Sequence, residues 1–294
     1  MSPPVKPVVC LFVINQYDLW RYAVSQYGMI IDLEKCVGCH ACAIACRAEW
    51  EVPTGKDSAE RERRRSWVKR LGPSKTPQGL ASTYYPGLCN HCDKPACVTV
   101  CPADKVEATF ADPKSGATKK MEVAATWKDP FNGTVQIDKE RCLGCGACAD
   151  ACPYSARYVN EEEGDPKADK CTFCVERLAQ GLEPACVQTC LARARIFGDL
   201  NDPNSEVAKY VQKGAAKLES AKVKIGPNVR YYGNKKDMHL LTTTSTPQAM
   251  PQANLRRTIM AHMLKPAMDQ VKNLGMFGLA GAVIVKGLSE DEKE

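Results

Sequence analysis

Cysteine is the feature of this sequence that most limits what the chain can fold into. Seventeen of the 294 residues are cysteine, and sixteen of these fall into four groups of four. The groups are Cys36, Cys39, Cys42 and Cys46; Cys89, Cys92, Cys97 and Cys101; Cys142, Cys145, Cys148 and Cys152; and Cys171, Cys174, Cys186 and Cys190. Only Cys10 stands apart. The thiols must therefore be explained before any other feature of the chain.

The spacing within the groups is typical of ligands to [4Fe-4S] clusters. The first and third groups read C-x2-C-x2-C-x3-C, the second C-x2-C-x4-C-x3-C and the fourth C-x2-C-x11-C-x3-C. Three thiolates on a tight loop can hold one cluster, while the fourth lies on the following helix and ligates a different cluster. Pro102 and Pro153 follow the last cysteine of two groups and help to turn the chain away, whereas Arg47 and Leu191 stand there in the others.

Three other uses of cysteine fit parts of this pattern. A disulfide scaffold is compatible with the even number, but a chain of this length does not need such crosslinks. Four-thiolate zinc sites use two separated C-x2-C pairs, as in the fourth group, yet the triple runs argue against zinc. The segment from Cys36 to His40 reads C-x-x-C-H, the attachment motif of c-type haem. Because Cys42 and Cys46 continue the cluster spacing, we interpret His40 as a residue at a helix edge near a cluster.

Composition otherwise indicates a soluble globular protein, with 44% hydrophobic and 25% charged residues and a mean hydropathy of -0.33. The formal net charge is +6. Sixteen thiolates around four cluster cores of charge about +2 would move this total to about -2. The excess of basic residues is therefore expected to compensate the negative charge of the clusters locally. We expect no binding of nucleic acid.

An internal repeat predicts a duplicated module. Ile31 and Asp32 precede the first group as Ile137 and Asp138 precede the third, at an offset of 106, while Pro95 to Val98 matches Pro184 to Val187 at an offset of 89. The predicted fold class is α+β, with two pseudo-symmetric bacterial-ferredoxin-like βαβ modules that each hold two [4Fe-4S] clusters, loop insertions and a C-terminal helical extension. Module A comprises residues 28–52 with 160–200, and module B comprises residues 85–159 with an inserted loop at 103–133.

The segments outside the modules are expected to connect or to dock. Residues 1–27 form an N-terminal strand segment, and residues 53–84 form a basic connector. The arginines and lysines of that connector are expected to be solvated, to dock an acidic partner surface or to offset cluster charge.

The part of the chain after the last cysteine is expected to be an extended tail, residues 201–256, followed by a helix for docking, residues 257–288. A short amphipathic helix is expected through Val207 and Tyr210, whereas Leu240 to Ala253 should be low in structure. The apolar run from Leu274 to Val285 has 12 residues and is too short to span a bilayer. No cleavable export signal is visible in Met1 to Trp20.

The four groups in this order resemble the iron-sulfur electron-transfer subunit, or beta subunit, of the dimethyl sulfoxide reductase superfamily of molybdopterin oxidoreductases. The strings KCTFC at 170–174, PAC at 184–186 and FGDL at 197–200 look most like the subunits of polysulfide, thiosulfate and tetrathionate reductases. The resemblance covers residue 28 to about residue 211.

This resemblance implies four [4Fe-4S] clusters with ligands exchanged between the groups. Cluster 1 would take Cys36, Cys39, Cys42 and Cys190; cluster 2 would take Cys89, Cys92, Cys97 and Cys152; cluster 3 would take Cys101, Cys142, Cys145 and Cys148; and cluster 4 would take Cys46, Cys171, Cys174 and Cys186. All sixteen positions of the pattern carry cysteine.

The resemblance further implies an electron relay with no chemistry on substrate. Its partners would be a large molybdopterin catalytic subunit containing molybdenum or tungsten, and a membrane anchor, quinone-reactive subunit or other carrier. The alternatives are a freestanding polyferredoxin-type carrier and a maturation or hydrogenase-linked ferredoxin subunit. The complex would be membrane-associated, and an extracytoplasmic location reached by co-export with a partner is favoured over a cytoplasmic one.

Four cations next to cysteines are expected either to tune cluster potentials or to face solvent. They are Lys35, Arg47, Arg141 and Lys170. A cation near a cluster stabilises its reduced form, so it raises the reduction potential.

Overall fold

The computed structural model describes residues 25–162, 164–254, 259–260 and 263. Most of the expected N-terminal strand segment, Cys10 and most of the expected docking helix at 257–288 therefore lie outside the described residues. In the part that is described, no helix combines the length and the apolar character needed to cross a bilayer.

A four-stranded sheet forms the centre of the fold, in the order β10-β1-β12-β11. Its strands are β1 (Tyr27–Asp32), β10 (Arg195–Asp199), β12 (Val229–Tyr232) and β11 (Ala216–Lys217). Strand β1 pairs antiparallel with β10 and parallel with β12. A βαβ unit has parallel strands, whereas β1 and β10, the first and last strands of the expected module A, run antiparallel.

The apolar sequence of β1 is explained by packing on both faces of the sheet. Met29 and Ile31 lie in one core cluster with Leu88 and Tyr231, and Ile30 points to the other face. There it packs with Val207 and other residues of helix α7 (Glu206–Gln212). Successive strand residues point to opposite faces, so a strand that is covered on both sides reads as a continuous apolar run. Helix α7 confirms the short helix expected through Val207.

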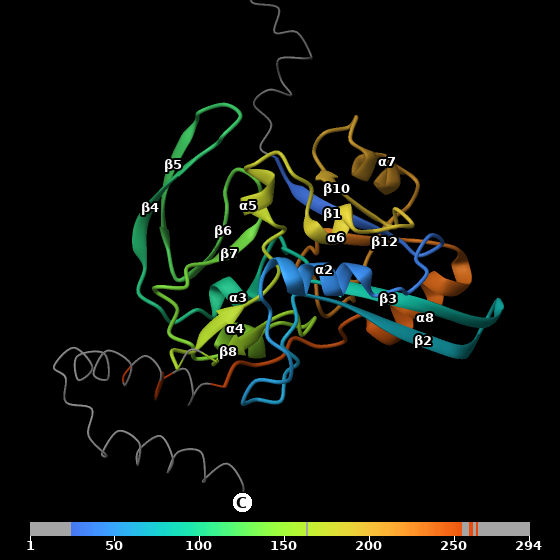
Figure 1. Ribbon diagram of the computed structural model, residues 1–294, viewed down its shortest axis with the longest axis horizontal. Helices are drawn as coiled ribbons and strands as arrows, with labels where there is room; N and C mark the ends of the chain where they lie inside the picture. Colours follow the sequence, from blue (N-terminus) through green and yellow to red (C-terminus); the bar gives the residue numbers. More distant parts are fainter. Residues whose placement is uncertain (1–24, 163, 255–258, 261–262, 264–294) are drawn as a thin grey trace, which may run out of the picture.

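Short helices place the cysteines beside this sheet (Figure 1). They are α2 (Ala41–Glu49), α3 (Ala96–Thr99), α4 (Ala147–Asp150), α5 (Val175–Leu178) and α6 (Ala185–Gln188). Helix α2 packs on α6, and α3 packs on α4, so helices from different cysteine groups lie together in pairs. Helices α2 and α4 begin after His40 and Gly146, both in the left-handed conformation, which turns the chain sharply out of the cysteine loop.

The described residues also form four two-stranded hairpins around the helices. They pair β2 (Ser66–Thr76) with β3 (Gly79–Leu88), β4 (Val106–Ala111) with β5 (Thr118–Val123), β6 (Thr126–Lys128) with β7 (Val135–Ile137), and β8 (Tyr158–Asn160) with β9 (Lys167–Asp169). The expected connector at 53–84 and the expected inserted loop at 103–133 therefore contain ordered strands. The longest hairpin was not predicted because it contains Pro73, which usually indicates a loop. Here the proline lies at an irregularity between Leu71 and Ser74, where a strand tolerates it.

The expectation of an extended tail over 201–256 is wrong for much of that segment. Strand β12 joins the central sheet, and helix α8 (Lys235–Ser245) packs on the β2–β3 hairpin. Asn234 caps α8 by accepting a hydrogen bond from the backbone N–H of Asp237 at 3.0 Å. Leu240 and Leu241 are the buried residues of this helix. The threonines at 242–244 weaken the sequence signal for this helix, because threonine has low helix propensity.

We expect Leu241→Ala to destabilise the protein by about 2 to 5 kcal/mol, because it empties part of the contact between α8 and the core. Leu241 is 0% exposed. The matched control is Leu80→Ala on the β2–β3 hairpin, where the leucine is 68% exposed and its loss should have little effect. Thermal unfolding of the iron-loaded protein measures both, and equal midpoints for the two variants would contradict the packing of α8.

Candidate iron-sulfur cluster sites

All sixteen cysteines in the described part of the chain are free, which excludes the disulfide scaffold. Among the described residues, no three histidine, cysteine or acidic side chains are grouped so that they could hold one metal ion. The sulfurs instead surround cavities with about 300 to 390 Å³ of empty space, part of which opens to solvent. Because the sulfurs line these cavities without being grouped to hold one ion, the arrangement suits a polynuclear group better than a single zinc ion.

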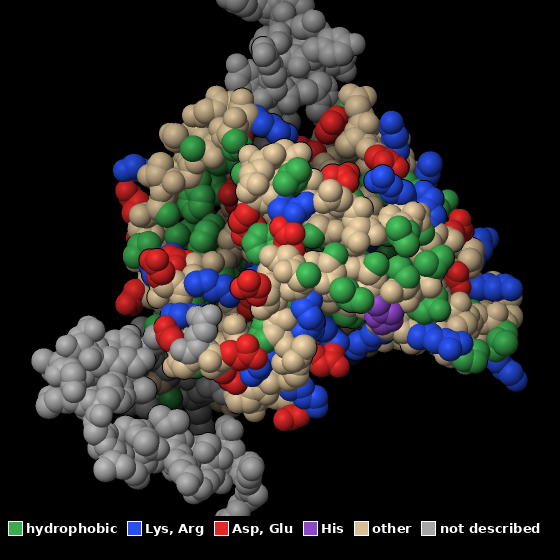
Figure 2. Space-filling view, in the orientation of Figure 1, with side chains coloured by type: hydrophobic (Ala, Val, Ile, Leu, Met, Phe, Trp, Pro, Cys, Tyr) green, Lys and Arg blue, Asp and Glu red, His purple; other side chains and the backbone are tan. Residues whose placement is uncertain are grey.

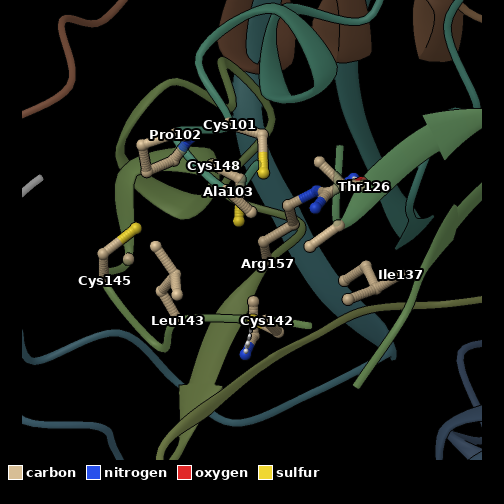
Figure 3. Close-up of a pocket in the computed structure, with 13 residues that line it drawn as sticks. Cys101, Pro102, Ala103, Thr126, Ile137, Cys142, Leu143, Cys145, Cys148 and Arg157 are labelled. Atoms are coloured by element: carbon tan, nitrogen blue, oxygen red, sulfur yellow. Dashed lines mark hydrogen bonds between the residues drawn. The ribbon is translucent and has the colours of Figure 1, made fainter. Parts of the chain in front are cut away.

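Three cavities are each lined by four cysteines. Cavity 1 is lined by Cys36, Cys39, Cys42 and Cys190; cavity 3 by Cys101, Cys142, Cys145 and Cys148; and cavity 4 by Cys46, Cys171, Cys174 and Cys186. In each cavity, three cysteines come from one group and the remaining one from another. Figure 3 shows cavity 3, with the Sγ atoms of Cys101, Cys145 and Cys148 around the space.

The remaining four cysteines are also close together. Burial strongly raises the pKa of Cys92, and the neighbouring thiolates of Cys89, Cys152 and Cys97 raise it further. Burial likewise raises the pKa of Cys152 to about 12, with Cys89 and Cys97 adding to the effect. We call this spatial set of Cys89, Cys92, Cys97 and Cys152 group 2. It differs from the second group in the sequence because it contains Cys152 in place of Cys101.

Burial makes these sites unfavourable for thiolates that lack a cation. It raises the pKa of Cys46 to about 12, and the pKa of Cys148 and of Cys186 to about 11. The metal ligand is the thiolate, so binding of iron must displace protons from these side chains. The positive charge of iron would compensate the buried sulfur charge. The lining of these cavities is therefore suited to a [4Fe-4S] cluster.

Hydrogen bonds to sulfur are already formed around the cavities. The backbone N–H groups of Ala194 and Ala156 donate to Cys190 Sγ and Cys152 Sγ at 3.2 and 3.5 Å. The indole N–H of Trp50 donates to Cys174 Sγ at 3.3 Å. Such bonds stabilise negative charge on the ligands and tune the potential of a bound cluster.

The four cations next to cysteines in sequence are committed to other partners. Arg47 donates to the carbonyl oxygens of Val52, Pro53 and Arg63; Arg141 bonds Asp138 and the carbonyls of Val123 and Ala124; and Lys35 bonds Tyr210. Lys170 is 1% exposed and donates to the carbonyl oxygens of Val135 and Cys171. Lys170 therefore does not face solvent, and its ammonium group holds two backbone segments together.

The arginines of the connector mostly bind acidic side chains of the same chain. Arg61 bonds Asp57 and Asp150, Arg63 bonds Glu162, and Arg65 bonds Asp169 through two nitrogens at 2.8 Å. The expectation that this basic run is solvated is therefore wrong for these arginines. Arg65 also lines cavity 4, which fits the expected compensation of sulfur charge.

Two arginines that the sequence analysis did not single out lie at the cavities. Arg157 lines cavity 3, and Arg195 lines cavity 1. Both are buried, at 2% and 3% exposure. The signal that could have found them is their equal spacing, since each stands five residues after the last cysteine of a group.

Cavity 1 has an exposed cysteine in its lining. Cys39 is the exposed member of the described cysteines. Three large apolar side chains close in sequence to the cysteines of this cavity are also exposed: Val37 at 64%, Ile44 at 66% and Leu191 at 86%. Figure 2 shows apolar side chains on the surface over α2.

Two comparisons define the class of protein. Residues 80–200 match the family described as 4Fe-4S dicluster domain, and residues 29–49 match the 4Fe-4S binding domain. The chain is therefore an iron-sulfur protein of the ferredoxin type, with [4Fe-4S] clusters as its cofactors.

Curated relatives define the family. A tetrathionate reductase subunit of Salmonella typhimurium is 39% identical over 210 residues, which cover 71% of this chain and 72% of the relative. A polysulfide reductase chain of Wolinella succinogenes is 40% identical, covering 64% and 83%. The thiosulfate reductase electron transfer subunit PhsB of Salmonella typhi is 35% identical, covering 69% and 90%.

This protein belongs to the same family, the iron-sulfur electron-transfer subunits of the dimethyl sulfoxide reductase superfamily. The resemblance seen in the sequence is thereby confirmed, and the chain's role is electron transfer. The freestanding polyferredoxin is not favoured, because the named relatives are subunits of reductases.

We expect Asp57→Asn to lower the stability of the loop that joins the connector to β8. The Asp57 carboxylate is 3% exposed and accepts hydrogen bonds from the backbone of Arg61 and Val159 and from the Arg61 side chain. An amide group cannot accept all of these, so a loss of about 2 to 4 kcal/mol is expected. Glu60→Gln, which removes only the exposed pair with Lys56, is the control and should leave the unfolding midpoint unchanged.

The same prediction has a defined pH dependence. Burial works to raise the pKa of Asp57, but the hydrogen bonds from Val159 and Arg61 outweigh it and lower the pKa below its usual value. The stabilisation is therefore present above the unfolded pKa of about 4 and is lost as the pH falls through the lower folded value. The difference in free energy of unfolding between the wild type and Asp57→Asn should become smaller as the pH falls. A difference that grows in acid would contradict the lowered pKa of Asp57.

Proposed function

We propose that this chain carries four [4Fe-4S] clusters in two ferredoxin-like modules and relays electrons within a reductase complex. Module A would hold clusters 1 and 4, and module B would hold clusters 2 and 3. The observation that carries this proposal is the lining of cavities 1, 3 and 4, each by four sulfurs that come from two distant cysteine groups.

The proposed ligand sets follow the same grouping. Cluster 1 takes the four cysteines of cavity 1, cluster 3 those of cavity 3, cluster 4 those of cavity 4, and cluster 2 those of group 2. Each cluster, when bound, accepts and releases one electron at a time. The chain's own part is to hold the sulfurs in place, to donate hydrogen bonds to them and to bury most of them.

The partners that fit this role are a large molybdopterin catalytic subunit with molybdenum or tungsten, and a membrane anchor or quinone-reactive subunit. Support comes from the relatives, which are named as chains or subunits of tetrathionate, polysulfide and thiosulfate reductases. No substrate chemistry is assigned to this chain. We propose a membrane-associated complex, with an extracytoplasmic location reached by co-export.

Cavity 1 is the proposed place of electron exchange with one of these partners. Cys39 is exposed, Val37 lines the cavity, and the exposed Ile44 and Leu191 lie within two residues of Cys42 and Cys190 in sequence. Apolar side chains at a rim exclude water when a partner covers them, and electron transfer needs the two cofactors to approach closely. The other cavities are lined by cysteines that are buried or half-buried.

The exchange of ligands between groups can be tested with pairs of cysteine substitutions. Cys190→Ser combined with Cys36→Ser should disturb one cluster, because both residues belong to the proposed cluster 1. Cys190→Ser combined with Cys186→Ser should disturb two. Electron paramagnetic resonance of the reduced protein, with iron analysis, counts the intact clusters. If each group held its own cluster, the two double variants would give the opposite counts.

Anaerobic affinity purification from the native host tests the proposed complex. About sixteen iron atoms per chain are expected, with molybdenum or tungsten and a large polypeptide in the same eluate. Iron and sulfide without a stable partner would contradict the subunit role while leaving the clusters intact. Zinc without labile sulfide would contradict the clusters themselves.

A further inference from the structure

Two arginines are buried where a cation is unexpected. Arg157 and Arg195 are 2% and 3% exposed, and neither forms an ion pair with a carboxylate among the described residues. The Nη1 atom of Arg157 and the Nε atom of Arg195 have no hydrogen-bond partner in the described part of the chain. An uncompensated buried charge is strongly destabilising, so the compensating negative charge must come from something else at the cavities.

The two arginines occupy equivalent places in the repeat. Arg157 lies five residues after Cys152, and Arg195 lies five residues after Cys190. In both segments the third residue after the cysteine, Ser155 or Arg193, has a positive φ, of 49° and 52°. The fourth residue is an alanine whose N–H donates to the sulfur of that cysteine. The same turn thus delivers an arginine side chain into each module.

Arg195 lies between cavities 1 and 4. It lines cavity 1 together with Cys42 and Cys190. Its Nη2 donates to Ser66 Oγ at 3.0 Å, and its Nη1 is 3.8 Å from Met29 Sδ. Ser66 and Met29 both line cavity 4. The guanidinium group therefore has one cavity on each side.

Arg157 has the same relation to cavity 3 and group 2. Figure 3 shows its side chain in the middle of the lining of cavity 3, near Cys148, with its end directed to Thr126. Its Nη2 bonds Thr126 Oγ1 at 3.2 Å. Burial works to lower the pKa of Arg157, but the thiolates of Cys97 and Cys148 outweigh it and raise the pKa. Cys148 belongs to cavity 3, and Cys97 of group 2 packs against the same small core as Cys148, so both sites lie close to the arginine.

We propose that Arg157 and Arg195 are shared counter-charges, each placed between the two clusters of one module, and that each raises the reduction potentials of both. This inference rests on the proposed cluster assignment. Reduction adds negative charge to a cluster, and a fixed cation nearby favours that state. One guanidinium group also attenuates the repulsion between two reduced neighbours. The two modules would thus be tuned by the same device.

The experiment uses the full chain with its clusters, titrated by electron paramagnetic resonance against solution potential. Arg195→Gln should lower both reduction potentials of module A by about 59 mV or more. This shift is a tenfold change in the one-electron reduction equilibrium. The potentials of module B should stay unchanged. Arg157→Gln should give the reverse pattern, so each variant contains its own control. Arg195→Lys, which keeps a positive charge, should retain potentials closer to the wild type.

A matched control lies two residues away. Arg193 is exposed, and Arg193→Gln should leave all four potentials unchanged. If a Gln variant loses iron, Ser66→Asp or Thr126→Asp places a carboxylate at the hydroxyl group that accepts the arginine hydrogen bond. The added carboxylate cancels the charge of the arginine while the arginine remains in place. The reduction potentials of that one module should therefore fall as in the Gln variant.

The outcomes separate this inference from the proposed function. Four clusters with unchanged potentials in both iron-loaded Gln variants would overturn the counter-charge role and leave the relay intact. A shift of all four potentials by one variant would also overturn it, because a general loosening would then be the cause. Fewer than four clusters in the wild type would contradict the cluster assignment itself.

Discussion

Compensation of buried sulfur charge is the constraint on which the rest of this structure depends. Burial raises the pKa of the cysteine thiols, to about 12 for Cys46 and Cys152, so thiolates persist there only with positive charge beside them. Iron supplies most of it. The short helices, the N–H groups directed at sulfur and the two buried arginines are all arrangements that make such sites tolerable within a small core.

The cysteine groups could be read from the sequence because their spacing is local. A loop that places three sulfurs around one cluster has the same residue intervals wherever it occurs, so the sites were visible without knowledge of the fold. The side-by-side packing of α2 on α6 could be anticipated only through the internal repeat and the family resemblance. Helix α7 was visible as a periodic apolar pattern.

Other features depend on long-range contacts and could not be read in this way. The β2–β3 hairpin contains Pro73 and Gly79, which ordinarily indicate a loop, and helix α8 ends in a run of threonines. Both are stabilised by packing on each other. The connector arginines appeared to be available to a partner because their acidic partners, such as Glu162 and Asp169, lie about a hundred residues further along the chain. Of the cations next to cysteines in sequence, Lys170 is buried and its charge acts on Cys97, whereas Arg157 and Arg195 stand five residues from the nearest cysteine and escaped notice.

The topology of the central sheet has a consequence for biosynthesis. Strand β1 lies near the start of the chain, but its two partners are β10 and β12, which end at Asp199 and Tyr232. Group 2 and cavity 3 draw their cysteines from the continuous stretch between Cys89 and Cys152. As the polypeptide leaves the ribosome, that half can close while the sheet still lacks two strands. With the proposed ligand sets, the first cysteine loop to be made would wait longest for its final ligand, Cys190, so iron and sulfide could be delivered to group 2 and cavity 3 first.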